Sequence, residues 1–199
     1  MARFSRRLHF AIHSAILFMT APVVTAVLTL TLILWLLIPQ SAYAANHTVG
    51  GVCGSTIQAC INFAAPGDTV IIPAGTYNES LTLSQPISLT GVSSTTTIIQ
   101  ALPNQRVLTV SGAAIDNSVL IAGLTFSGGD LSGGNICFNA GTDNCGAGIL
   151  LTNNAQPFIQ DVIIENNTGY RGGGLYANET GGLVLDRVVF RNNSVLLTG

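Results

Sequence analysis

The C-terminal quarter of the chain repeats itself at a period of 26 residues, and this repeat constrains the fold more than any single motif. Gly146–Ile149 aligns with Gly172–Leu175 without a gap, and Val162–Asn167 then aligns with Val188–Asn193. A fixed period of this length, built from short β-branched runs separated by Gly and Asn, is typical of a solenoid. One such unit is too small to bury an apolar face alone, so successive units must stack.

Short apolar runs precede the repeats, and none of these runs is long enough to form a helix. They lie at Thr69–Ile72, Ile87–Thr90, Thr97–Gln100, Val107–Val110 and Val119–Phe126. Antiparallel hairpins and a parallel coil both fit such spacing. Hairpins, however, predict clean alternation and two-residue Asn-Gly turns, and neither feature dominates this chain. We therefore expect an all-β, parallel β-helix solenoid of about five rungs, in which each strand pairs with the same strand one rung away.

Stacking places charged residues of opposite sign above one another. Asp161 and Arg187 differ by 26 positions, as do Glu165 and Arg191. Each acid then lies about 4.8 Å from an arginine in the same column. We interpret these as structural ion pairs on the outer surface, each of which stabilises the fold by less than about 1 kcal/mol.

Asparagines also recur at this period, and they are expected to mark a bend. Asn166 and Asn167 recur as Asn192 and Asn193. Asparagine tolerates left-handed backbone geometry, and its side-chain amide can hydrogen-bond to the equivalent amide in the next rung. The sequence therefore predicts an asparagine ladder along one edge of the solenoid.

The first 44 residues have the order of a secretory signal peptide. Arg3, Arg6 and Arg7 form a basic start, an apolar run covers Ala21–Ile38, and Ala42-Tyr43-Ala44 is a small-x-small cleavage signal. The apolar run is just long enough for a membrane span, so an uncleaved N-terminal anchor is the competing interpretation. In both cases the rest of the chain is exported.

The exported part is acidic. It contains no lysine, and it has four arginines against nine Asp and Glu, for a net charge of −5. This charge argues against nucleic acid or an anionic membrane surface as a partner. We expect contact with a membrane only through the N-terminal segment or a missing C-terminal region.

Residues 45–66 are expected to form an N-terminal cap, followed by the parallel β-helix over 67–199. Ser55-Thr56-Ile57-Gln58 has the pattern of a helix capping box. Behind it, apolar residues recur at helical spacing, and Pro66-Gly67-Asp68 ends the pattern. The members of this apolar face are Ile57, Cys60, Ile61 and Ala64. We expect this short helix to cover the first rung.

All four cysteines lie in the exported part, which favours disulfides. Proximity suggests Cys53–Cys60 and Cys137–Cys145, although three pairings are possible. The competing four-cysteine zinc site lacks any Cys-x-x-Cys pair, so no metal site is expected from the cysteines.

An insertion interrupts the rungs. Leu124–Ser127 matches the segment that starts at Val162, but at an offset of 38, so 12 residues are extra within 128–145. With a disulfide between Cys137 and Cys145 at its base, this segment is expected to project from the stack as a cross-linked loop. Loops of this kind often contain the binding site of a repeat protein. Oxygen-bearing side chains in it could hold Ca²⁺ or bind a sugar, and the competing interpretation is a plain polar, Gly-rich loop. The candidate ligand-binding residues are Asp130, Asn135, Asn139 and Asp143.

The repeat motifs carry a resemblance to known proteins. The Gly-Gly-x-aliphatic unit with Phe-x-x-Asn at Phe190–Asn193 resembles the repeats of chlamydial polymorphic outer membrane proteins. More broadly, residues 50–199 look like right-handed parallel β-helix proteins of the pectate-lyase-like superfamily. The entry segment around Pro66–Val70 and Pro73–Tyr77 is similar to the opening of many extracellular bacterial members.

The resemblance implies a choice between binding and catalysis. Hydrolytic members need a His and an Arg-x-Lys, whereas this chain has no lysine and no histidine after His47. Lyases need a calcium cage and a basic residue, for which Asp161, Asp186 and Arg187 are the best alternative catalytic set. The ion-pair interpretation is preferred, so we expect no catalytic residues and no cofactor, with Ca²⁺ as the only metal considered.

The expected function is therefore a non-catalytic recognition or adhesion surface. It would be presented by a secreted or bacterial cell-surface or outer-membrane protein, with an extracellular glycan or another cell-surface molecule as partner. The alternative is a calcium-dependent polysaccharide lyase-like enzyme. Because Gly199 falls in the column of Gly173, we also expect an uncapped C-terminal end and the front portion of a longer protein.

Overall fold

The computed structural model describes residues 25–30, 43–133, 145–178 and 181–196. The chain divides into two compact units, Met1–Tyr43 and Ala44–Gly199. Residues 25–30 of the first unit are helical. Within the described ranges, no helix combines the length and the apolar character that crossing a membrane requires. Most of the predicted apolar run Ala21–Ile38 lies outside these ranges.

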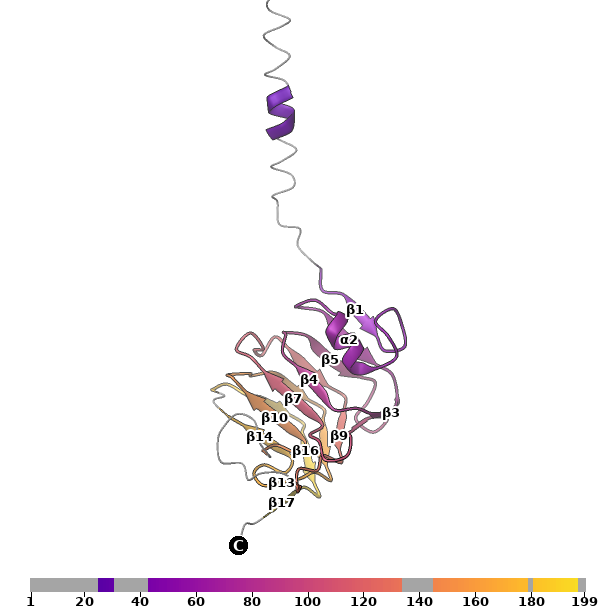
Figure 1. The fold of residues 1–199 in the computed structure, drawn as a ribbon, viewed down its shortest axis with the longest axis vertical. Coiled ribbons are helices and arrows are strands. Elements are labelled where there is room, and N and C mark those ends of the chain that lie inside the picture. Colours follow the sequence, from indigo (N-terminus) through magenta and orange to yellow (C-terminus); the bar gives the residue numbers. More distant parts are fainter. Residues whose placement is uncertain (1–24, 31–42, 134–144, 179–180, 197–199) are drawn as a thin grey trace, which may run out of the picture. The chain divides into compact units, whose positions relative to one another are not determined.

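The strands of the second unit form three parallel sheets and one short parallel pair (Figure 1). Sheet 1 has the order β1 (Asn46–Thr48), β2 (Thr69–Ile72), β5 (Ser88–Gly91), β8 (Leu120–Ala122), β11 (Phe158–Gln160), β15 (Val184–Asp186). Sheet 2 has the order β4 (Leu81–Leu83), β7 (Leu108–Ser111), β10 (Ile149–Thr152), β14 (Leu175–Ala177). Sheet 3 has the order β3 (Gly75–Asn78), β6 (Thr97–Gln100), β9 (Thr125–Ser127), β12 (Ile163–Glu165), β16 (Val189–Arg191), and the short pair is β13 (Thr168–Gly169) with β17 (Ser194–Val195).

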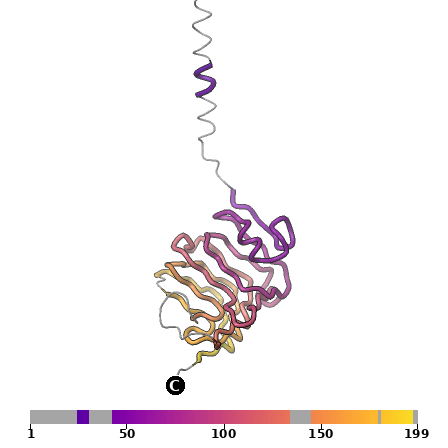
Figure 2. The backbone as a smooth tube through the Cα atoms, in the orientation of Figure 1, coloured from indigo at the N-terminus to yellow at the C-terminus, as the bar shows by residue number. Residues whose placement is uncertain are grey.

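The predicted parallel pairing is confirmed, and the all-β arrangement is compatible with a parallel β-solenoid. Within the second unit, Figure 2 shows the chain passing through neighbouring coils in sequence order, from purple at its first residues to yellow at its last described residues. The last two coils keep the sequence period in their register, because Ile149 pairs with Leu175, Ile159 with Leu185, and Ile164 with Phe190. The gapless alignment of the repeats is therefore also the strand register.

Apolar side chains fill the interior in columns, one column for each inward-facing sheet position. In sheet 1, Val70, Leu89, Ile121 and Ile159 follow one another in register, and all four are fully buried. Full burial of a side chain of this size stabilises a fold by about 1.5–3 kcal/mol. The other fully buried columns are Leu108–Ile149 and Leu83–Val110–Leu151 in sheet 2 and Ile99–Phe126–Ile164 in sheet 3.

The corners between sheets 1 and 3 depend on left-handed backbone geometry. Gly123, Asp161 and Arg187 occupy the same corner in three successive coils, with φ of 65°, 53° and 51°. The bend at Gly123 divides the apolar run Val119–Phe126 into β8 and β9. Glycine adopts this geometry without a steric penalty, whereas other residues do so at a cost.

A short helix, α2 (Ile57–Phe63), precedes the first full coil and packs on β2 and β4. The predicted capping box is wrong in its details. Thr56 is the N-cap and accepts a hydrogen bond from the Ala59 N–H, whereas the Gln58 amide reaches Asn62 and the backbone of Thr82. The carboxylate of Glu79 accepts hydrogen bonds from the N–H groups of Ile57 and Gln58, at 2.9 and 3.0 Å. An acid from the coil below therefore replaces the capping box.

The predicted disulfide between Cys53 and Cys60 is present and ties the chain before α2 to the helix itself. Cys60 is fully buried, and Cys53 is 7% exposed, so the bridge is part of the core beneath the cap. Cys145 is also disulfide-bonded. Its predicted partner, Cys137, lies outside the described residues.

The last strands of sheets 1 and 3 are less covered than the strands before them. Leu185 and Phe190 continue the columns of Ile159 and Ile164, but they are 42% and 47% exposed, whereas their predecessors are fully buried. Val184 and Val189 beside them are similarly exposed. An apolar cross-section of the stack therefore faces solvent at β15 and β16.

Candidate functional site

Both ends of the insertion at 128–145 attach to the same stretch of the following coil. On the way out, the N–H of Leu131 donates to the carbonyl of Thr168 at 2.9 Å, beside a parallel bridge between Asp130 and Thr168. On the way back, the N–H of Gly146 donates to the carbonyl of Arg171 at 2.8 Å, beside a parallel bridge between Cys145 and Arg171. The base of the insertion is therefore fixed by backbone pairing, whatever the disulfide adds.

Arg106 holds the returning end of the insertion. Its Nε donates to the carbonyl of Gly146 at 2.8 Å, and its Nη2 donates to the carbonyl of Cys145 at 2.7 Å. Its Nη1 donates to the hydroxyl of Thr109 at 3.2 Å. Burial lowers the pKa of the guanidinium to about 10, so Arg106 keeps its charge at neutral pH. A charged donor directed at two carbonyls is a strong, geometrically fixed anchor.

A small apolar cluster lies outside the main core at this base. Cys145 and Leu150 are 2% and 3% exposed, and the half-buried rings of Tyr170 and Tyr176 pack against them. The Tyr170 hydroxyl donates to the carbonyl of Ser132 at 3.5 Å, which links the ring to the outgoing end of the insertion. Both tyrosines are therefore held at the base of the insertion by this cluster, which is separate from the main core.

The outer face of sheet 2 continues this cluster as a column. Thr82, Thr109, Leu150 and Tyr176 are in register in β4, β7, β10 and β14, on the face opposite the core columns. Their side chains therefore form a strip in which two threonine hydroxyls are followed by the buried Leu150 and then by Tyr176. Rigid strands position every group of this strip, which a loop alone would not do.

Of the four predicted ligand-binding residues in the insertion, only Asp130 is described. Its Oδ1 accepts a hydrogen bond from the N–H of Ser132 at 2.9 Å. Hydrogen bonds from the Ser132 side chain and backbone lower the Asp130 pKa. The others, Asn135, Asn139 and Asp143, lie outside the described residues. Among the residues with described positions, no group of three or more His, Cys, Asp or Glu side chains comes together in a way that could hold a metal ion.

The alternative catalytic set lies at the corner between sheets 1 and 3. Arg187 Nε donates to Asp161 Oδ1 at 2.5 Å, and its Nη2 donates to Asp161 Oδ2 at 2.8 Å, while its Nη1 donates to Asp186 Oδ2 at 2.6 Å. The hydrogen bond to Asp161 raises the pKa of Arg187, and the same contact lowers the pKa of Asp161. Both side chains are about half exposed. The three groups thus form an exposed ion-pair cluster in which the arginine is held in its charged form.

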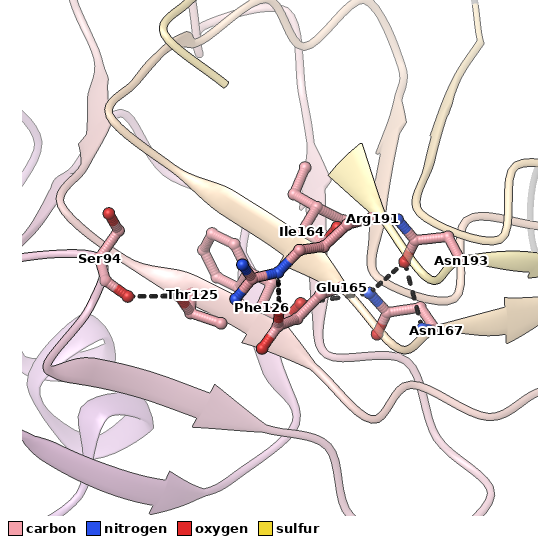
Figure 3. A network of polar contacts seen from close by, with 8 residues as sticks. All are labelled: Ser94, Thr125, Phe126, Ile164, Glu165, Asn167, Arg191 and Asn193. Carbon is pink, nitrogen blue, oxygen red and sulfur yellow. Dashed lines mark hydrogen bonds and ion pairs between the residues drawn. The ribbon is translucent and has the colours of Figure 1, made fainter. Parts of the chain in front are cut away.

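The second predicted ion pair lies in neighbouring strands of sheet 3. Arg191 Nε donates to Glu165 Oε2, with the acid largely covered and the arginine about half exposed (Figure 3). The pair is formed between directly registered residues of β12 and β16. It bridges two coils on the outer side of the sheet.

The asparagines divide into two structural roles. Asn166 and Asn192 have φ of 55° and 53° and form the bend itself. Asn167 is fully buried, and its Nδ2 donates to Asn193 Oδ1 at 3.0 Å and to the Phe126 carbonyl at 3.2 Å (Figure 3). The amide ladder is therefore formed by Asn167 and Asn193, while the preceding residue in each rung turns the chain.

Arg106, Tyr170 and Tyr176 are not among the site residues that the sequence predicted. The partners of Arg106 are backbone carbonyls about 40 positions away, which leave no side-chain pattern to detect. Comparison of the chain with models of known protein families, with curated proteins and with solved structures found no match. The assignment of a function therefore depends on the geometry of the site itself.

Proposed function

We propose that this chain is an exported, non-catalytic surface protein that recognises a glycan through the strip on sheet 2 and the adjoining base of the insertion. In this proposal the fold is a right-handed parallel β-helix of about five rungs, similar to the pectate-lyase-like superfamily. The leader directs export and is removed after Ala44. The protein is then secreted or displayed at a bacterial surface or outer membrane, where adhesion is a suitable role.

The observation that carries the proposal is the column Thr82–Thr109–Leu150–Tyr176 beside the cluster at the loop base. Tyrosine offers an apolar ring with a polar tip, and threonine offers a hydroxyl that both donates and accepts. These groups suit a sugar ring, which has apolar faces and hydroxyl edges. Because Arg106 and backbone pairing fix the loop base, little conformational entropy would be lost on binding.

The ion-pair cluster supports a non-catalytic role for the corner between sheets 1 and 3. A general base must lose its proton near the working pH. The bond to Asp161 raises the pKa of Arg187, which is the opposite of what proton abstraction requires. The two acids of the set are also occupied by the same guanidinium.

The proposal is tested with the exported protein on an array of immobilised glycans, followed by titration of any glycan that binds. Tyr176→Ala is expected to weaken binding at least tenfold, and Thr109→Val to weaken it several-fold. Thr90→Val is the matched control, because Thr90 is registered with the outer residue Ile71 on sheet 1 and should leave the affinity unchanged.

Two results would overturn the proposal. One is an array without a bound glycan, or binding that Tyr176→Ala and Thr90→Val affect equally. The other is calcium-dependent formation of unsaturated products from polygalacturonate that is lost in Arg187→Ala but kept in Arg106→Ala. The second result would establish the lyase-like activity in place of recognition.

A further inference from the structure

A buried carboxylate lies next to the residue that follows the predicted cleavage signal. Asp68 ends the turn Ala65-Pro66-Gly67-Asp68, in which the N–H of Asp68 donates to the carbonyl of Ala65 at 3.0 Å. Proline at the second position and Gly67 with φ of 93° at the third are the requirements of a type II turn. The local sequence therefore fixes where this carboxylate points.

The Asp68 carboxylate accepts three hydrogen bonds. Its Oδ2 accepts from the N–H of Ala65 at 2.9 Å and contacts His47 Nε2 at 2.7 Å. Its Oδ1 accepts from the backbone nitrogen of Ala45 at 2.8 Å. Its side chain is 9% exposed, and the ring of Phe63 packs edge-on against His47 at 5.2 Å. The nitrogen of Ala45 thus meets a carboxylate that is shielded from most of the solvent.

Ala45 is hydrogen-bonded through both its backbone nitrogen and its backbone carbonyl. The N–H of Thr69 donates to the Ala45 carbonyl at 2.8 Å, so both the nitrogen and the carbonyl of Ala45 are fixed beside β2. Tyr43, two residues earlier, is 93% exposed. The peptide bond between Ala44 and Ala45 therefore lies at the start of the second unit, directly after Ala42-Tyr43-Ala44 in the sequence, where Tyr43, Ala44 and Ala45 are all exposed.

We infer that Asp68 is the docking site for the N-terminus that processing creates at Ala45. Hydrolysis of the Ala44–Ala45 bond adds one water. Ala44 leaves with a carboxylate, and Ala45 keeps an α-amino group that takes up a proton at neutral pH. The contact of 2.8 Å then changes from an amide hydrogen bond to an ion pair between ammonium and carboxylate.

This inference rests on the proposed export and cleavage, and it adds a consequence for the mature protein. Removal of the leader strengthens the attachment of β1 to the fold instead of leaving a frayed end. The processed chain is therefore expected to be more stable than a chain with even one extra residue before Ala45. Maturation and final stability become coupled through a single side chain.

Few ionisable groups face this site. His47 comes from β1, and Asp68 lies immediately before β2. β2 has no ionisable side chain, and α2 has none except the disulfide-bonded Cys60. The hydrogen bond from Ala45 is the largest cause that lowers the Asp68 pKa, followed by His47 and Ala65. A charge on the nitrogen of residue 45 would therefore interact mainly with the Asp68 carboxylate.

The test uses the full-length gene, expressed with its own leader in a secreting bacterial host. Mass spectrometry of the exported product is expected to find Ala45 at the N-terminus. An α-amino group ordinarily has a pKa of about 7.7–8.0. Ion pairing should raise it by about one unit, a tenfold change in the proton dissociation constant, measured by NMR titration of the Ala45 amine.

The sign of the stability effect follows from this shift. Because the folded pKa is raised, the extra stability is complete below pH 8 and is lost as the pH rises through the folded value. The melting temperature of the processed protein should therefore fall between pH 8 and pH 10. A variant with one serine inserted between Ala44 and Ala45 keeps Asp68 but moves the charge away, and it should show no such fall.

Asp68→Asn should likewise abolish the alkaline fall, and His47→Gln should keep it. If Asp68→Asn does not fold, the serine insertion alone decides the question. An N-terminus found elsewhere than Ala45 would contradict the processing site. An N-terminus at Ala45 with an ordinary amine pKa, and with equal pH profiles for the wild type and the insertion, would overturn the docking role while leaving export intact.

Discussion

Asn167 and Asn193 are joined side chain to side chain although they lie 26 residues apart. Asn167 Nδ2 donates to Asn193 Oδ1 at 3.0 Å, and the backbone N–H of Asn167 donates to the same oxygen at 3.2 Å. Asn193 Nδ2 in turn donates to the carbonyl of Ile164 at 2.8 Å. These side-chain bonds add to the backbone pairing at the bend, where the carbonyl of Asn167 accepts from the N–H of Ser194 at 2.8 Å.

Replacement of Asn167 by alanine is expected to lower the free energy of unfolding by about 2–4 kcal/mol. Asn167 Oδ1 accepts from the N–H of Gly129 at 2.8 Å, and its Nδ2 donates to the Phe126 carbonyl. Both partners would be left without this bond in the interior. Urea denaturation followed by circular dichroism measures the loss.

Asn193→Ala should cost about 1 kcal/mol, because Asn193 is only half-buried and water can replace part of what is lost. Asn117→Ala, at an exposed position, serves as the neutral control. Equal losses for Asn167→Ala and Asn193→Ala would show that the buried amide has no special role in holding the coils together.

A second prediction concerns the bend itself. Asn166 has φ of 55°, so Asn166→Ala should destabilise the fold by about 1 kcal/mol, whereas Asn166→Gly should be nearly neutral. The same pair of substitutions at Asn192, where φ is 53°, is a matched repeat of the experiment one coil further on. If thermal unfolding showed the alanine variant to be more stable than the glycine variant at either position, the assigned backbone geometry would be contradicted.

The last two coils could be predicted from the sequence because side chains of one kind recur at the same interval as the strands. Ile164 and Phe190 occupy one inward column, so the alignment of the repeats predicts their pairing. Earlier coils have no constant interval. Leu89 pairs with Ile121 at 32 residues, and Ile98 pairs with Thr125 at 27. The turns between sheets differ in length there, and the repeat disappears from the sequence while the stacking continues.

Short or irregular strands were also missed. β1, β3 and β4 each have only three or four residues, and Gly75–Asn78 in particular lacks an apolar alternation. Their pairing with a neighbouring coil, and not their own sequence, makes them strands. The same limit applies to the loop base, where Arg106 binds carbonyls and no side-chain pattern marks its partners.

The ion pair between Asp161 and Arg187 should make part of the stability depend on both pH and salt. The contact lowers the Asp161 pKa, so its contribution is present above the ordinary aspartate value of about 3.9 and is lost as the pH falls through the lowered folded value. Arg187→Gln should remove this acid-dependent part. Melting curves at pH 7 and pH 3, in low and in 1 M salt, measure it.

Asp116 is the control for this measurement. Hydrogen bonds from Ser118, and not from an arginine, lower its pKa. The effect of Asp161→Asn should therefore shrink in high salt, while that of Asp116→Asn should change little. A salt dependence that is the same for both variants would mean that the pairing with Arg187 contributes nothing measurable to stability.

The column that contains Ile164 and Phe190 provides a final test of how the stack is covered. Ile164 is fully buried between coils, so Ile164→Ala should cost about 2–5 kcal/mol through the cavity it leaves. Phe190 occupies the next position of the column but is 47% exposed, and Phe190→Ala should cost less than half as much although it removes more atoms. Chemical denaturation of both variants, with the slope compared to the wild type, gives the two values. If Phe190→Ala proved as costly as Ile164→Ala, the ring would have to be buried in solution, and the apolar cross-section at β15 and β16 could not be open to solvent.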